Sequence, residues 1–149
     1  MESNNKVGLV GHINLKLYDT DGKLKSEVDK RNVIVTVGKN FMAAWLAAAS
    51  QATPFMNYIG LGTGTTAASA SDTTLETPIG VRVAGTISSS TNTWTNQTTF
   101  APGVSTGAIT EAGIFSALTS GTMMARQTFP VQNKLAGDTI VFTWNITIS

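Results

Sequence analysis

Apolar and polar residues alternate along much of this chain, beginning close to its N-terminus. Leu9, Ile13 and Leu17 fall on one side of the first alternating segment, and alternation with a period of two is typical of a half-buried strand. Asp19–Gly22 favours a tight turn, because glycine tolerates a positive φ and an aspartate side chain bonds its own backbone. A second strand follows that turn, so we predict an N-terminal hairpin over residues 7–37.

One segment has a helical pattern instead. Residues 39–51 are rich in alanine, leucine and methionine, which are strong helix formers, and Phe41 and Trp45 lie one turn apart on the same face. Pro54 then disfavours a longer helix. We predict one short α-helix at about residues 39–51, whose aromatic side chains cover an open side or end of a sheet. Contact with another subunit is the alternative interpretation of this face.

The rest of the chain returns to short alternating segments separated by turn residues. These segments are residues 57–62, 80–88, 93–100, 107–116, 122–129 and 138–148. With the hairpin they make about eight strands, a number and spacing typical of a sandwich or barrel. The predicted fold is mainly β: an antiparallel β-sandwich or jelly-roll-like domain with one helix. We expect a single domain over residues 1–149, with a polar arm at residues 1–6 and the main β region at residues 57–148.

The composition indicates a protein whose surface is covered by neighbours. Charged residues make up 13% of the chain, against about 25% in ordinary soluble domains, whereas 42% of residues are hydrophobic. A surface with so few charges favours association, so we predict a homo-oligomer, a dimer or a trimer. The net charge of +1 argues against a nucleic-acid partner, and the lack of a long apolar run argues against a membrane span.

Candidate chemistry is sparse. The chain has no cysteine and one histidine, His12, which lies within the first predicted strand. No Gly-x-Ser-x-Gly motif is present, and neither a thiolate metal site nor a Cys-His pair can form. We therefore expect no enzymatic activity, no catalytic residues, no metal and no cofactor.

Three charged residues stand in apolar surroundings. They are Arg82, Glu111 and Arg126. A charge near a core usually needs a partner, because an unpaired buried charge costs several kcal/mol. We predict a structural ion pair between Glu111 and either Arg82 or Arg126; exposure of all three to solvent is the alternative.

A series of motifs along the chain resembles a known group of proteins. In order, they are Tyr58–Thr66 (YIGLGTGTT), Ser71–Glu76 (SDTTLE) with Arg82, Phe100–Gly103 (FAPG), Ile109–Phe115 (ITEAGIF), Met124–Pro130 (MARQTFP), Lys134–Ile140 (KLAGDTI) and Thr143–Ile148 (TWNITI). Over about residues 32–148 the chain resembles small structural proteins of tailed bacteriophages. The resemblance implies a virion component, made in the host bacterial cytoplasm. It favours a capsid decoration or cement protein bound to the major capsid protein, with a head-fibre, collar, tail or baseplate component as the alternative.

Subunit contacts are expected at three places. The candidates are Val7, Leu9 and Val10 in the arm and first strand, Thr63 and Thr65 in a loop rich in glycine and threonine, and Met123 and Met124 as exposed apolar positions. The loop could equally be a solvent-exposed connection. A carbohydrate-binding module is the alternative from another functional class, and Trp94, which lies between threonines, is its candidate exposed aromatic residue.

Overall fold

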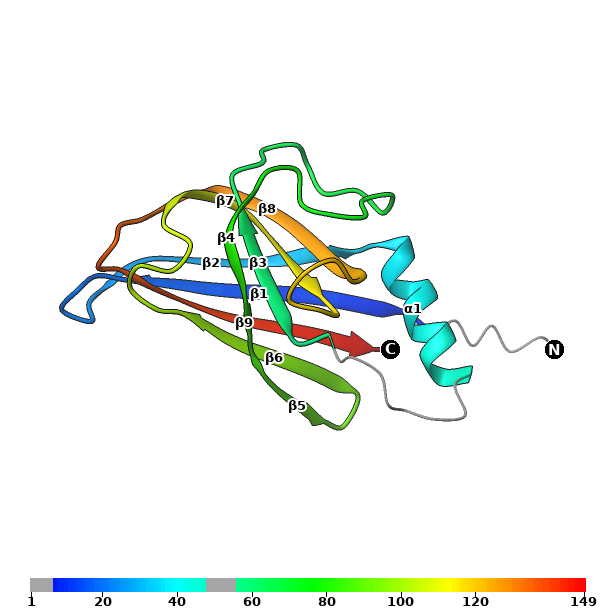
Figure 1. Ribbon diagram of the computed structural model, residues 1–149. Coiled ribbons are helices and arrows are strands. Elements are labelled where there is room, and N and C mark those ends of the chain that lie inside the picture. Colours follow the sequence, from blue (N-terminus) through cyan, green and yellow to red (C-terminus); the bar gives the residue numbers. More distant parts are fainter. Residues whose placement is uncertain (1–6, 48–55) are drawn as a thin grey trace.

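The computed structural model describes residues 7–47 and 56–149, which form nine strands and one helix (Figure 1). The elements are β1 (Leu9–Tyr18), β2 (Leu24–Ile34), α1 (Thr36–Ala47), β3 (Tyr58–Gly62), β4 (Pro78–Ala84), β5 (Thr86–Ser90), β6 (Thr93–Phe100), β7 (Gly107–Phe115), β8 (Met123–Lys134) and β9 (Thr139–Ile148). All strand pairs are antiparallel, in the order β4-β3-β7-β8-β2-β1-β9-β6-β5. The mainly β prediction is confirmed. The predicted polar arm, residues 1–6, lies outside the described residues.

The predicted N-terminal hairpin is present as β1 and β2, but Thr36 and Val37, predicted to end its second strand, belong to α1. Ile13, Leu15 and Leu17 are buried on one side of β1, as the period-two pattern requires. In the turn, the Asp19 carboxylate accepts hydrogen bonds from the backbone amides of Asp21 and Lys23, both at 2.9 Å, and Gly22 has a φ of 78°. The hairpin occupies the middle of the sheet, so β1 and β2 are part of its framework.

The helix begins three residues before the predicted start and runs from Thr36 to Ala47; the predicted residues 48–51 lie outside the described residues. Gly38, which falls before the predicted start, lies inside the first turn. A Cβ on Gly38 would lie 2.6 Å from the carbonyl oxygen of Met124, so the missing side chain lets α1 pack directly on β8. Helix propensity alone did not indicate this close contact.

The strands form one continuous sheet, whereas we predicted a sandwich. Val33 and Ile34 at the end of β2 pair with β8, which joins the two halves of the strand order. The two edge strands, β4 and β5, are consecutive in the chain and separated by Gly85 alone, so the sheet curls into a nearly closed, barrel-like shape (Figure 1). This break also divides the predicted strand at residues 80–88 into two, giving nine strands instead of about eight.

The core lies inside this curl. Ile140, Phe142, Trp144 and Ile146 of β9 are buried, which fits the alternation of the segment at residues 138–148, and the Trp144 indole donates a hydrogen bond of 2.9 Å to the Asn32 side chain. No helix within the described residues has the length and apolar character needed to span a membrane.

Strand β8 continues past its predicted end at Phe129 to Lys134. Its pairing with β7 is irregular where Pro130 lies, between Gln132, which faces Ile109, and Thr128, which faces Glu111. A bulge tolerates proline because a residue there need not donate to the ladder.

Candidate functional site

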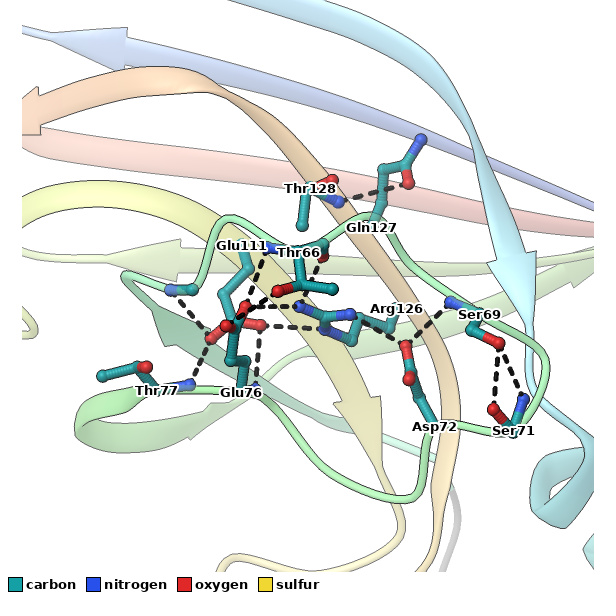
Figure 2. Close-up of polar contacts among 11 residues, drawn as sticks. Thr66, Ser69, Ser71, Asp72, Glu76, Thr77, Glu111, Arg126, Gln127 and Thr128 are labelled. Carbon is teal, nitrogen blue, oxygen red and sulfur yellow. Dashed lines mark hydrogen bonds and ion pairs between the residues drawn. The ribbon is translucent and has the colours of Figure 1, made fainter.

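A fully buried carboxylate holds the long connection between β3 and β4. Glu111 extends from β7, and its two oxygens accept hydrogen bonds from three backbone amides of that connection (Figure 2). The donors are the amides of Gly64 at 3.1 Å, Glu76 at 3.1 Å and Thr77 at 2.8 Å. Both ends of the segment 63–77 are therefore fixed to the same side chain.

Arg126 on β8 lies beside this carboxylate and is almost fully buried. Its Nε donates to Glu111 at 2.8 Å, and its two terminal nitrogens reach Asp72 at 2.8 Å and Glu76 at 3.6 Å. It also donates to the carbonyl oxygen of Thr66 at 3.1 Å. We call Asp72, Glu76, Glu111 and Arg126 the ion cluster; Figure 2 shows the three carboxylates grouped around the guanidinium of Arg126.

The electrostatics of the ion cluster favour the charged forms of Arg126 and Glu76. Burial by itself would lower the pKa of Arg126, but hydrogen bonds to Asp72 and Glu111 and their negative charges raise it overall. Hydrogen bonds from the backbone amide and hydroxyl of Thr66 lower the pKa of Glu76, with a further contribution from the charge of Arg126. Each oxygen of Glu111 already accepts two hydrogen bonds from within the chain. The ion cluster is therefore a structural clamp.

The structure thus brings Glu111 and Arg126 together, one of the two predicted pairs, and keeps Arg82 apart. The guanidinium of Arg82 lies 3.5 Å from the centroid of the Phe115 ring, and it donates to the carbonyl oxygens of Ala117 at 2.8 Å and Ser120 at 2.5 Å. A Cβ on Gly60 would lie 3.2 Å from both Arg82 and Phe115, so this glycine makes room for the stacked pair. Burial lowers the pKa of Arg82. Arg82 therefore holds the connection between β7 and β8 against β4.

The predicted contact residues in β1 and in the glycine- and threonine-rich loop are partly accessible. Val7 and Val10 are exposed, whereas Leu9 is half-buried and packs against the core. Thr63 is half-buried and Thr65 is exposed. Several residues of the segment that carries them are exposed, as the alternative of a solvent-exposed connection expects, and the ion cluster holds that segment at several points.

The prediction that Met123 and Met124 are exposed is wrong. Met123 packs with Val35, Leu75 and Phe115 on one side of β8, and Met124 joins the main core on the other. Both faces of β8 are covered here, which a strand pattern cannot reveal because the covering groups come from distant parts of the chain.

An apolar groove lies between α1 and one end of the sheet. Its volume is about 510 Å³, and its lining comes from α1, β5, β6, β8, β9 and Met56, which precedes β3. The lining residues are Phe41, Met42, Trp45, Leu46, Met56, Ile87, Ser88, Ser89, Trp94, Met124, Ile146 and Ile148. The helix therefore covers this end of the sheet incompletely, and Leu46 remains 75% exposed.

Sequence reasoning identified the aromatic residues of α1 but not the groove as a whole. Two further large apolar residues could have indicated the groove: Trp94 near the start of β6 and Ile148 at the end of β9. Trp94 is half-buried in the groove instead of standing free in solvent.

Within the described part of the chain, no group of three or more histidine, cysteine, aspartate or glutamate residues is placed to hold a metal ion. Comparisons with models of protein families, with curated proteins and with solved structures found no match to this chain.

Proposed function

We propose that this chain is a non-enzymatic structural protein of a tailed-bacteriophage particle that decorates the capsid and stabilises its lattice. The observation that carries the proposal is the uncovered apolar groove beside α1. It is lined by large apolar side chains with only two serines among them, and a surface of this kind typically marks an interaction site. The bacteriophage context comes from the resemblance of residues 32–148, which is a sequence argument.

The groove and the exposed part of β1 lie close together. Ile148, which lines the groove, pairs with Leu9, and Val7 and Val10 flank that position in the chain. Of the three predicted contact regions, Met123 and Met124 are buried; the contact surface that we propose combines the groove with the exposed residues around the start of β1, at the helix end of the sheet. The major capsid protein is the proposed partner there.

The low charge of the chain supports the same function. A lattice presents many identical sites, so a decoration protein is retained by repeated modest contacts instead of one very strong contact. Each contact needs an apolar centre and a surface that neighbours can approach without charge repulsion. The groove provides the first, and 13% charged residues provide the second.

A purified particle tests the proposal directly. We would quantify this chain and the major capsid protein by mass spectrometry of the particle that carries both. A fixed ratio set by the capsid lattice is the expected result. A few copies per particle would instead indicate a head-fibre, collar, tail or baseplate component, and absence from every particle fraction would refute the proposal.

A carbohydrate-binding module is the second candidate, because Trp45 and Trp94 both line the groove. Aromatic rings can stack on sugar faces, but sugar hydroxyl groups also need polar partners. Apart from the indole N–H groups of Trp45 and Trp94, only Ser88 and Ser89 provide polar side-chain groups in the lining, and such a lining suits apolar protein side chains better. Specific binding on a glycan array, lost in Trp94→Ala, would favour this second candidate.

A further inference from the structure

The two edge strands of the sheet differ in how their free backbone groups are satisfied. On β4, the hydroxyl of Ser105 accepts a hydrogen bond from the Val81 amide at 3.3 Å and donates one to the Val81 carbonyl at 3.2 Å. Pro78 begins that strand and Arg82 lies within it. Proline, charge and a covering loop are the usual protections of an edge strand against pairing with another chain.

Strand β5 has none of these protections in its sequence. Its five residues, Thr86–Ser90, contain no charge and no proline, and four of them are exposed. The direction of their backbone groups follows from the neighbouring strands. The Ile148 amide donates to the Asn92 carbonyl at 2.9 Å, so the even-numbered residues of β6 face β9.

The odd-numbered residues of β6 therefore face β5, where they pair with Thr86, Ser88 and Ser90. The amides and carbonyls of Ile87 and Ser89 consequently point away from the sheet. These groups have no backbone partner among the described residues. An edge of this kind is a template for an added strand.

The free edge adjoins the apolar groove. Ile87, Ser88 and Ser89 belong to β5 and also line the groove, so a strand added to β5 would lie along its mouth. No lining residue is charged, and two identical copies of this surface can therefore meet without like-charge repulsion.

We infer that β5 is a self-association edge: two copies of this chain pair through β5, antiparallel, about a twofold axis at Ser88. This arrangement places Ile87 of one copy opposite Ser89 of the other, and the reverse, so both outward residues of each strand exchange backbone hydrogen bonds. A second copy fits because each chain supplies the same uncharged free edge. The inference deepens the proposed structural function by naming the surface through which copies assemble.

Cysteine cross-linking tests the register. The chain has no cysteine, so Ser88→Cys introduces a single thiol. At the twofold axis the two copies of residue 88 form a non-hydrogen-bonded pair with Cα atoms about 4.5 Å apart, within the range of a disulfide. Thr86→Cys is the matched control: it is exposed on the same strand and face, but its two copies would lie about 14 Å apart.

Mild oxidation with diamide and non-reducing electrophoresis should give at least about tenfold more disulfide-linked dimer for Ser88→Cys than for Thr86→Cys, since only the former meets the disulfide distance. Equal cross-linking of the two variants, or none in either, would overturn the inference.

Sedimentation velocity provides an independent measurement. Ser89→Pro removes an outward amide without removing a bond to β6, so it should convert the dimer to a monomer with an unchanged circular dichroism spectrum. Ser89→Ala keeps the amide and should remain dimeric. A monomeric wild-type protein, or a dimeric Ser89→Pro, would refute pairing through β5.

Particle binding separates this inference from the proposed function. A wild-type chain that dimerises through β5 but is absent from particles would refute capsid decoration and leave the β5 pairing intact. A wild-type chain that is monomeric but bound to particles in lattice ratio would refute the β5 pairing and support capsid decoration.

Discussion

The ion cluster and the apolar groove show two opposite uses of side chains in one small protein. In the ion cluster, a buried carboxylate and a buried guanidinium are surrounded by partners from the same chain, and the segment 63–77 is closed over them. In the groove, aromatic and aliphatic side chains from α1 and three strands remain partly uncovered. The charged groups of the ion cluster are paired within the chain, whereas the apolar side chains of the groove remain partly open to solvent.

We infer from this difference that the ion cluster serves the fold, whereas the groove is the contact surface of the proposed function. A buried ion pair fixes one geometry, because its charges lose much free energy if their partners are misplaced. An exposed apolar surface gains free energy only when another surface covers it. Substitutions in the two regions should therefore affect different measurements.

The largest effect on stability is expected from Glu111→Gln. The new amide nitrogen would replace an oxygen that accepts hydrogen bonds, so it would face donors, and Arg126 would lose its most buried carboxylate partner. We expect the free energy of unfolding to fall by about 3–5 kcal/mol, as when one partner of a buried ion pair is removed. Urea unfolding followed by fluorescence measures it.

Glu27→Gln is the matched control for that experiment. Glu27 is an exposed carboxylate on β2 that accepts a hydrogen bond of 2.7 Å from Asn14. Its replacement should change stability by less than about 0.5 kcal/mol, since exposed polar pairs contribute little. Equal losses in the two variants would show that the ion cluster has no special structural role.

A smaller effect is expected from Arg82→Met. Methionine keeps an apolar stem over Phe115 but removes the hydrogen bonds to the carbonyls of Ala117 and Ser120. Water can reach part of this loop and replace them, so we expect a loss of about 1–2 kcal/mol. Arg31→Met, at an exposed position on β2, should change the urea midpoint little. If Arg82→Met left the free energy of unfolding unchanged, the guanidinium would not hold this loop.

Acid should destabilise the ion cluster through protonation of Glu76. The pKa of Glu76 is lowered in the folded chain by its hydrogen bonds to Thr66, so the unfolded chain binds more protons as the pH falls. The stabilisation from Glu76 is fully present above its unfolded pKa of about 4.3 and is lost as the pH falls through the lower folded value.

Glu76→Gln should therefore lose less thermal stability than the wild type when the pH is lowered from 7 to 3. Asp21→Asn is the control, because the exposed Asp21 carboxylate accepts no hydrogen bond from the described residues. Identical acid sensitivity of wild type and Glu76→Gln would contradict this role of Glu76.

The sequence predicted the features that depend on local pattern. Alternation identified β1 and β9 with the correct buried faces, and turn chemistry identified the loop at Asp19. The need of a charge for a partner limited Glu111 to two arginines, one of which is its partner. These predictions succeed because their physical causes lie within a few residues or in the chemistry of one side chain.

Features that depend on distant segments could not be predicted in this way. The burial of Met123 depends on Leu75, and the single curled sheet depends on the pairing of Val33 with Arg126. The groove requires α1, β5, β6 and β9 together. No local pattern encodes these contacts. An apolar residue that is buried cannot be distinguished in the sequence from one of the same type that is exposed.

The smallest effect on stability, and the sharpest contrast with Glu111→Gln, is expected from Leu46→Glu. Leu46 is 75% exposed at the edge of the groove, so a charge there should change the free energy of unfolding by less than about 0.5 kcal/mol. It would, however, place a charge on the surface that a partner must cover and desolvate. Leu135→Glu is the control, because Leu135 is 64% exposed in the turn between β8 and β9, outside the groove lining. We expect Leu46→Glu to lose retention on particles in a co-sedimentation assay while Leu135→Glu keeps it. Equal retention of the two variants would remove the groove from the contact surface, and equal loss would mean that any exposed apolar residue contributes.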